Sequence, residues 1–139
     1  MTRRGFTLIE TLVAVAIAAI AARTTVLATA SLAASLRVGA STRTLAQTMR
    51  ETRARAMAEG ESLDVVFDAP TSRWTVRTLD GIIRHAEPLP DPVRFVSLPA
   101  RASVRFTATG MADNATIVLG TSRSTGRIIV NQRGRVRLG

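Results

Sequence analysis

The arginines near the C-terminus are the residues whose spacing most directly suggests chemistry. In the ending NQRGRVRLG, Arg133, Arg135 and Arg137 occupy every second position. In an extended strand they would project from one face about 6.6 Å apart, since each residue adds roughly 3.3 Å, and such a row can follow phosphates. Arg123 and Arg127 would widen the patch. With one tryptophan and four phenylalanines, base stacking has little support, so a solvated or structural role is the alternative.

A second unusual feature is a carboxylate inside an apolar segment. Residues 6–22 are apolar apart from two threonines and Glu10, and arginines flank the segment on both sides. At about 1.5 Å per residue, such a helix spans a hydrocarbon core of about 30 Å only if its flanks stretch or snorkel. The arginines before it predict a cytoplasmic N-terminus. A secretory signal peptide and a plain membrane anchor are the alternatives, but neither explains the cost of burying the charge.

Catalytic groups are sparse in the sequence. The one histidine, His85, lies two residues before Glu87 in IIRHAEPLP, and a lone histidine in such a segment is typical of a surface residue. The segment TSRSTG, with Ser122 and Ser124, predicts a polar hairpin turn. Metalloprotease, P-loop and serine-hydrolase motifs are missing, and the acidic residues lack calcium-loop spacing. We therefore expect that the protein is not an enzyme and binds neither a metal nor a cofactor.

Length and charge limit the organisation further. With 139 residues, the chain has room for one modest fold unit and a long accessory segment. It contains no cysteine, which excludes disulfide scaffolds and thiolate metal sites. The formal net charge is +9, and all nineteen basic residues are arginines. This charge favours nucleic acid or an anionic membrane as a partner without establishing either.

The hydrophobic pattern predicts a long helix followed by strands. Good helix formers and the lack of proline predict one nearly continuous helix over residues 6–58, with Gly39 as its weakest point and Gly60 after its end. We expect one face of this helix to pack against a core, and we expect Met57 to be buried in the core as well. The residues that share this face are Val38, Leu45, Met49, Thr52 and Ala56.

Short alternating runs after Gly60 predict one antiparallel sheet of six or seven strands, with prolines at 88, 90 and 92 in a loop. The runs are residues 62–67, 73–78, 93–98, 103–109, 115–120 and 127–132. The fold class is α+β, with the sheet packed on the second half of the helix.

The N-terminal residues resemble the signature of a known family. The string GFTLIE at residues 5–10, followed by TLV, closely resembles the start of type IV pilins and of type II secretion pseudopilins. The resemblance implies that a prepilin peptidase cuts between Gly5 and Phe6 and that the new amino terminus of Phe6 is methylated. It also implies that Glu10 meets the amine of Phe6 on a neighbouring subunit during filament assembly, which lowers the cost of burying both charges.

The C-terminal half resembles the GspH minor pseudopilins of type II secretion and the FimT proteins of type IV pili. The resemblance is carried by RARAMAEG at 53–60, the strand with Trp74, Leu89-Pro90, VRFTATG at 104–110 and GRIIVNQRGRVRLG at 126–139. It implies a minor subunit that joins the filament tip and primes assembly. Among FimT relatives a GRxR-like ending, here residues 134–137, is associated with DNA capture during natural transformation, which is the alternative function.

The implied organisation has four segments. Residues 1–5 are a leader, 6–22 a transmembrane and filament-core helix, 23–59 its continuation, and 60–139 a periplasmic β-rich domain. The expected location is the bacterial inner membrane in a single pass, and then the filament. The expected partners are pilin-like subunits, the peptidase, the membrane and, in the alternative, DNA. The sequence does not distinguish a secretion pseudopilus from a type IV pilus.

Overall fold

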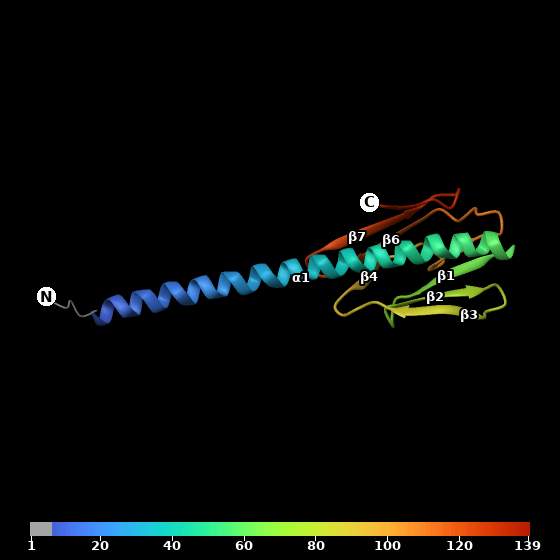
Figure 1. Cartoon of the computed structure of the whole chain (residues 1–139). Coiled ribbons are helices and arrows are strands. Elements are labelled where there is room, and N and C mark those ends of the chain that lie inside the picture. Colours follow the sequence, from blue (N-terminus) through green and yellow to red (C-terminus); the bar gives the residue numbers. More distant parts are fainter. Residues whose placement is uncertain (1–6) are drawn as a thin grey trace. The chain divides into compact units, whose positions relative to one another are not determined.

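The computed structural model describes residues 7–139, with the side chains of residues 23–30 left aside. In this part of the chain, one helix precedes eight strands (Figure 1). The elements are α1 (Leu8–Glu59), β1 (Leu63–Asp68), β2 (Arg73–Thr78), β3 (Ile83–Pro88), β4 (Arg94–Ser97), β5 (Ser103–Phe106), β6 (Ala115–Gly120), β7 (Thr125–Val130) and β8 (Val136–Leu138).

Helix α1 runs without interruption over 52 residues, and Gly39 does not break it. It ends as the sequence predicts, because Gly60 adopts a left-handed conformation with a φ of 68°. The backbone N–H of Glu61 then donates to the carbonyl oxygen of Ala56 at 3.2 Å, which satisfies a carbonyl of the last turn. This turn directs the chain back along the helix into β1.

The strands form two antiparallel four-stranded sheets, so the prediction of one sheet is wrong. The first sheet has the order β3-β2-β1-β5 and the second has the order β4-β6-β7-β8. The chain leaves the first sheet after β3, forms β4 at the edge of the second, and returns for β5 beside β1. Since these pairings join strands that are distant in sequence, local patterns do not reveal them.

Two strands are missing from the six predicted runs. Strand β3 contains His85 and ends at Pro88, which places this proline in a strand and not in the expected loop. Its residues are exposed or half-buried on both faces, so it lacks the alternation that marks a strand in the sequence. The other missed strand, β8, has only three residues.

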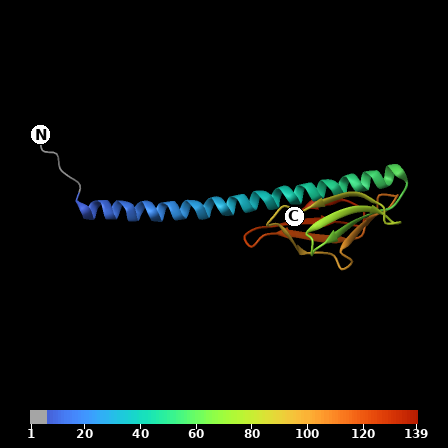
Figure 2. The ribbon, with the colours of Figure 1, turned by 90° about the horizontal axis from the view of Figure 1, so that it is seen from below.

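One core joins α1 to the inner faces of both sheets, and Figure 2 shows the C-terminal half of α1 lying along the strands. The predicted helix face is confirmed, since all five of its residues are buried. Met57 is a correction, because its side chain is 42% exposed. It follows buried Ala56 directly, and one residue turns the helix by about 100° away from the core.

An ion pair links the outer sides of β1 and β5. The guanidinium of Arg105 donates from Nε to Asp64 Oδ1 at 2.8 Å and from Nη2 to Oδ2 at 3.1 Å. The hydrogen bonds to Asp64, followed by its negative charge, raise the pKa of Arg105 above its usual value. Asp64 is buried, so this pair satisfies a carboxylate that has little access to water.

The chain divides into two compact units, residues 1–33 and Ala34–Gly139. The second unit contains the core, both sheets and the C-terminal half of α1, so it begins inside the segment 23–59. A helix followed by antiparallel strands confirms the predicted α+β class.

Candidate functional site

The predicted processing residues Gly5 and Phe6 lie outside the described residues. The structure begins with Thr7, which precedes α1 and accepts from the backbone N–H of Glu10, at 3.0 Å to its carbonyl oxygen and 3.4 Å to Oγ1. Thr7 and Glu10 therefore occupy the two ends of a T-x-x-E capping pattern. Capping was not part of the sequence analysis, although the spacing of the two residues could have indicated it.

The Glu10 side chain is exposed in the first turn of α1. A carboxylate is favourable there, because the backbone N–H groups of the first turn carry a partial positive charge. No described residue forms an ion pair with Glu10. Its carboxylate is therefore open to a contact from outside the described residues.

Apolar side chains surround the first half of α1 without a core of their own. They are Leu8, Ile9, Leu12, Val13, Val15, Ile17 and Ile20, all more than half exposed. Among residues 7–22 and 31–139, no helical stretch is long and apolar enough to cross a membrane.

The C-terminal arginines are only partly arranged as predicted. Arg137 lies in β8, but Arg133 lies in the turn between β7 and β8 and Arg135 lies just before β8. The predicted single extended row is therefore wrong. The turn forms because Gly134 adopts a φ of 70° and its N–H donates to the carbonyl oxygen of Asn131 at 2.8 Å. Asn131 also accepts from the N–H of Arg135 through Oδ1 at 2.9 Å.

Arg127 and Arg137 lie together on the outer face of the second sheet. Val130 and Val136 point into the core, so the alternate residues of β7 and β8 point outward. Arg137 lies opposite Ile129, and the Gly139 N–H donates to the Arg127 carbonyl oxygen at 2.9 Å, which makes Arg127 a diagonal neighbour of Arg137.

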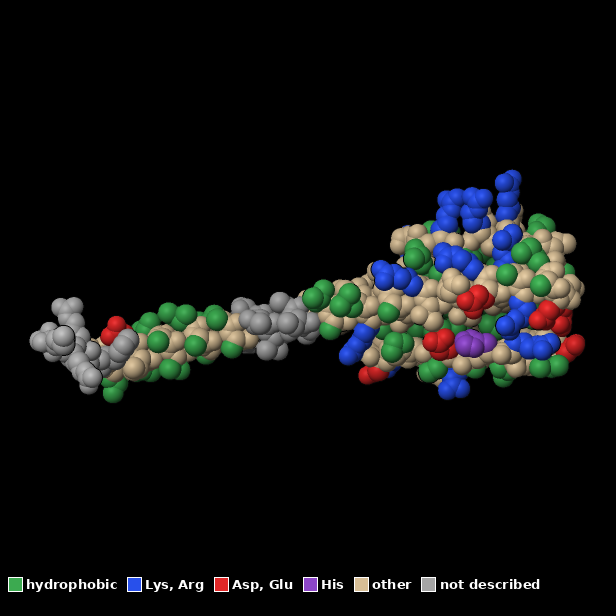
Figure 3. All heavy atoms as spheres, in the orientation of Figure 1, with side chains coloured by type: hydrophobic (Ala, Val, Ile, Leu, Met, Phe, Trp, Pro, Cys, Tyr) green, Lys and Arg blue, Asp and Glu red, His purple; other side chains and the backbone are tan. Residues whose placement is uncertain are grey.

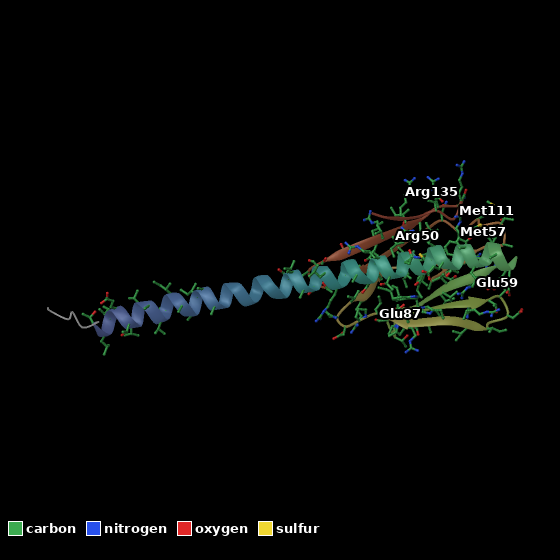
Figure 4. All side chains as sticks on the ribbon, in the orientation of Figure 1. Arg50, Met57, Glu59, Glu87, Met111 and Arg135 are labelled. Atoms are coloured by element: carbon green, nitrogen blue, oxygen red, sulfur yellow. The ribbon has the colours of Figure 1, made fainter. Side chains whose placement is uncertain are left out.

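All five predicted arginines are exposed. Arg123 lies in the β6–β7 turn, where the Thr121 N–H donates to the Ser124 carbonyl oxygen at 2.8 Å, as predicted for this segment. Residues 114–139 contain these five arginines and no carboxylate side chain. Figure 3 shows blue side chains gathered along this side of the molecule, and Figure 4 shows Arg135 pointing away from α1. We call the five residues the outer arginines.

Two arginines of α1 anchor this region, which the sequence analysis missed. Arg53 Nε donates to the Gly110 carbonyl oxygen at 2.8 Å, and Arg50 Nη2 donates to the Val136 carbonyl oxygen at 3.3 Å. A Cβ at Gly134 would lie 2.2 Å from the Gly110 oxygen and 2.6 Å from Arg53 Nε. Gly134 is therefore required both by its backbone conformation and by the close approach of two other segments.

His85 and Glu87 are the only histidine–carboxylate pair that the sequence suggested, and no catalytic role was expected for them. His85 Nε2 lies 3.3 Å from Glu87 Oε2, both half-exposed, on the face of β3 that looks toward α1. Among the described residues, no group of three or more histidine or acidic side chains is placed to hold a metal ion.

Two family models match two separate parts of the chain. Residues 1–22 match the prokaryotic N-terminal methylation motif, and residues 41–134 match type II transport protein GspH. No curated protein matches the chain.

Solved structures of minor pilin-like subunits share the fold. The minor pseudopilin EpsH from the type 2 secretion system of Vibrio cholerae superposes with a TM-score of 0.62 at 16% identity, over 74% of this chain and 96% of that one. The type IV minor pilin FimU of Pseudomonas aeruginosa gives a TM-score of 0.62 at 14% identity, over 73% and 87% of the two chains.

The GspH match spans more than half of the chain, and the structural neighbours have the same α+β pilin-like fold. GspH-like chains are structural subunits that assemble with other pilin subunits, and they are not enzymes. The chain therefore belongs to the GspH family of type II transport proteins.

Proposed function

We propose that this chain is a minor subunit that enters the inner membrane through residues 6–22, is cut after Gly5, and joins the filament tip to prime its assembly. The observation that carries the proposal is the exposed apolar surface of α1 over residues 8–22, next to a carboxylate without a partner among the described residues. Lipid would cover this surface before assembly, and other subunits would cover it afterwards.

Glu10 has a specific role in this proposal. The amine of Phe6 on one subunit would pair with the Glu10 carboxylate of its neighbour, so that neither charge stays unpaired in an apolar environment. The processed chain would have 139 − 5 = 134 residues and, after loss of Arg3 and Arg4, a formal side-chain charge of 17 − 10 = +7.

Intact-mass analysis of the protein extracted from membranes tests the processing step. The expected mass is that of a chain beginning at Phe6 with one added methyl group. A chain beginning after Ala21 or Ala22 would instead identify a secretory signal peptide, and an uncut chain would identify a plain anchor. Either of these masses would exclude a processed filament subunit.

A second candidate function is DNA capture by the outer arginines. The specific observation in its favour is that five exposed arginines share a segment that has no carboxylate side chain. Guanidinium groups bind phosphate through paired N–H donors, and unpaired arginines keep these donors available. This surface would bind the DNA backbone without reading its sequence.

Binding of the full chain in detergent to double-stranded DNA, measured over a salt series, tests this second function. Changing Arg133, Arg135 and Arg137 to Ala should weaken binding and reduce the slope of log affinity against log salt by about 2 to 3. The matched control changes to Ala three exposed arginines that lie outside residues 114–139. These are Arg73, Arg77 and Arg101. Equal losses in the two triple variants would show a general charge effect and exclude a site at the outer arginines.

A further inference from the structure

A groove on the opposite side of α1 from the outer arginines has no role in the functions above. It lies between α1 and β3 and has a volume of about 550 Å³. Val76, His85 and Glu87 form its floor, since His85 pairs with Val76 and Glu87 pairs with buried Trp74. Its wall is a polar stripe of α1 over residues 43–55. Figure 4 shows Glu87 beside α1, and Figure 3 shows the purple histidine between acidic and basic side chains.

The strand that borders this groove has a free edge. Among the described residues, β3 pairs only with β2, and its other side makes no backbone hydrogen bond to a strand or loop. Its six residues are exposed or half-buried. An edge strand of this kind presents a row of unpaired N–H and C=O groups to which an extended segment can add.

The charges of the groove are unevenly satisfied. Glu87 lies 3.3 Å from His85, and Glu51 accepts a hydrogen bond from Gln47 at 2.8 Å. Arg43 and Arg84 also line the groove, and neither guanidinium has a hydrogen bond or an ion pair with a described residue. Three arginines line the groove, Arg43, Arg55 and Arg84, against the two glutamates, so with histidine counted as neutral its formal charge is positive, which favours an occupant with carboxylates.

We infer that the α1–β3 groove is the site at which an extended, acidic segment of a neighbouring pilin-like subunit adds to the free edge of β3. Its backbone pairs with β3, and alternate side chains lie on the side that faces α1, where carboxylates reach Arg84 and Arg43. The inference rests on the proposed function as a filament subunit and names a contact within it.

A second copy of this chain fits the groove less well. Pairing of two β3 edges in the antiparallel sense would reverse the direction of α1 in the second copy. Subunits that share one membrane and one filament need the same direction, so this arrangement conflicts with the proposed function. A different subunit that supplies a loop or an edge strand has no such restriction.

Photo-crosslinking in cells that assemble the filament tests this inference. A benzoylphenylalanine replaces His85 in the groove, Arg101 in the turn before β5 as an exposed control, or Ile9 in the first half of α1. We expect crosslinks to pilin-like subunits from positions 85 and 9 but not from position 101. In the position-85 protein, Arg84→Glu or Arg43→Glu should lower the crosslinked fraction about tenfold or more through like-charge repulsion, whereas Arg73→Glu should not.

The remaining outcomes separate the two proposals. Crosslinks from position 9 without any from position 85 would overturn the groove inference and leave the filament function in place. Loss of both would contradict the filament function, and the groove inference with it. A crosslink from position 85 to a second copy of the chain, to an unrelated protein, or equally from position 101 would also overturn the inference. A crosslinked fraction unchanged by both charge reversals would exclude carboxylate recognition.

Discussion

The two halves of α1 are both rich in apolar residues, but they differ in what those residues contact. In the second half, Val38, Leu45 and Met49 are 1% exposed or less and contribute to the core. In the first half, Leu8 is 80% exposed and Leu12 is 62% exposed. The apolar residues of the second half thus stabilise the folded unit of this chain. Those of the first half gain burial only when lipid or another subunit covers them, so they contribute to location and assembly instead.

Truncating one leucine in each half of α1 tests directly whether only the second half contributes to the stability of the folded unit. Leu45→Ala removes a fully buried side chain and should lower the free energy of unfolding by about 2–5 kcal/mol. Leu12→Ala should change it by less than about 0.5 kcal/mol, as at exposed positions in general. Denaturant unfolding of both variants in the same detergent provides the measurement. Similar losses would mean that the first half also packs against the folded unit.

Within the second unit, two glycines with nearly the same backbone conformation allow the cost of crowding to be separated from the cost of backbone strain. Gly60 and Gly134 have φ values of 68° and 70°, but only Gly134 is crowded. Gly134→Ala should cost about 2–4 kcal/mol, since strain and overpacking add. Gly60→Ala should cost about 1 kcal/mol through strain alone. Thermal unfolding compares the two variants, and equal shifts in Tm would contradict the close approach of Arg53 and Gly110 to Gly134.

The ion pair of Arg105 distinguishes a structural arginine from the unpaired ones. Arg105→Met leaves the buried carboxylate of Asp64 without its donors and should cost about 1–3 kcal/mol. Arg101→Met, at an exposed position, should have almost no effect. A loss that persists in high salt is expected, because a partly buried pair is screened less than a surface pair. If Arg101→Met were as destabilising as Arg105→Met, net charge would explain both losses.

The pKa of Arg105 predicts how this pair responds to pH. The pKa is higher in the folded chain than in the unfolded chain, so the contribution of Arg105 is fully present below its unfolded pKa and declines only as pH rises through the folded pKa. Across neutral pH this contribution should be constant. A difference between wild type and Arg105→Met that varied between pH 6 and pH 9 in unfolding experiments would contradict this assignment.

The sequence predicts the parts of the fold that depend on local periodicity. The buried face of α1 and the turn at Gly60 follow from helical spacing and glycine conformation, and six of the eight strands follow from alternation. Strand β3 escapes prediction because both of its faces are exposed. The division into two sheets could not be predicted, because β1 and β5 pair across 35 or more intervening residues.

The candidate sites show the same limit. Alternation places Arg137 correctly on an outward face, but it misplaces Arg133, because Arg133 lies in the turn that the Gly134 N–H closes onto Asn131. The close packing of Arg53 and Gly110 around Gly134 comes from other elements, so no local pattern shows it. The groove beside β3 depends on how far α1 covers the first sheet, which no local pattern encodes. By contrast, the signature around Glu10 is contiguous in the sequence, so the N-terminal match to the methylation motif follows directly from it.

The measurement that most directly tests the different roles of the two halves of α1 is the incorporation of Glu10→Gln into filaments, compared with its stability. The variant should unfold with the Tm of wild type, because Glu10 has no contact with the core. Its incorporation should fall by a factor on the order of a hundred or more, as expected when one partner of a buried charge pair is removed. Wild-type incorporation of Glu10→Gln, or a lowered Tm that accounts for its loss, would contradict the assignment of the first half of α1 to assembly.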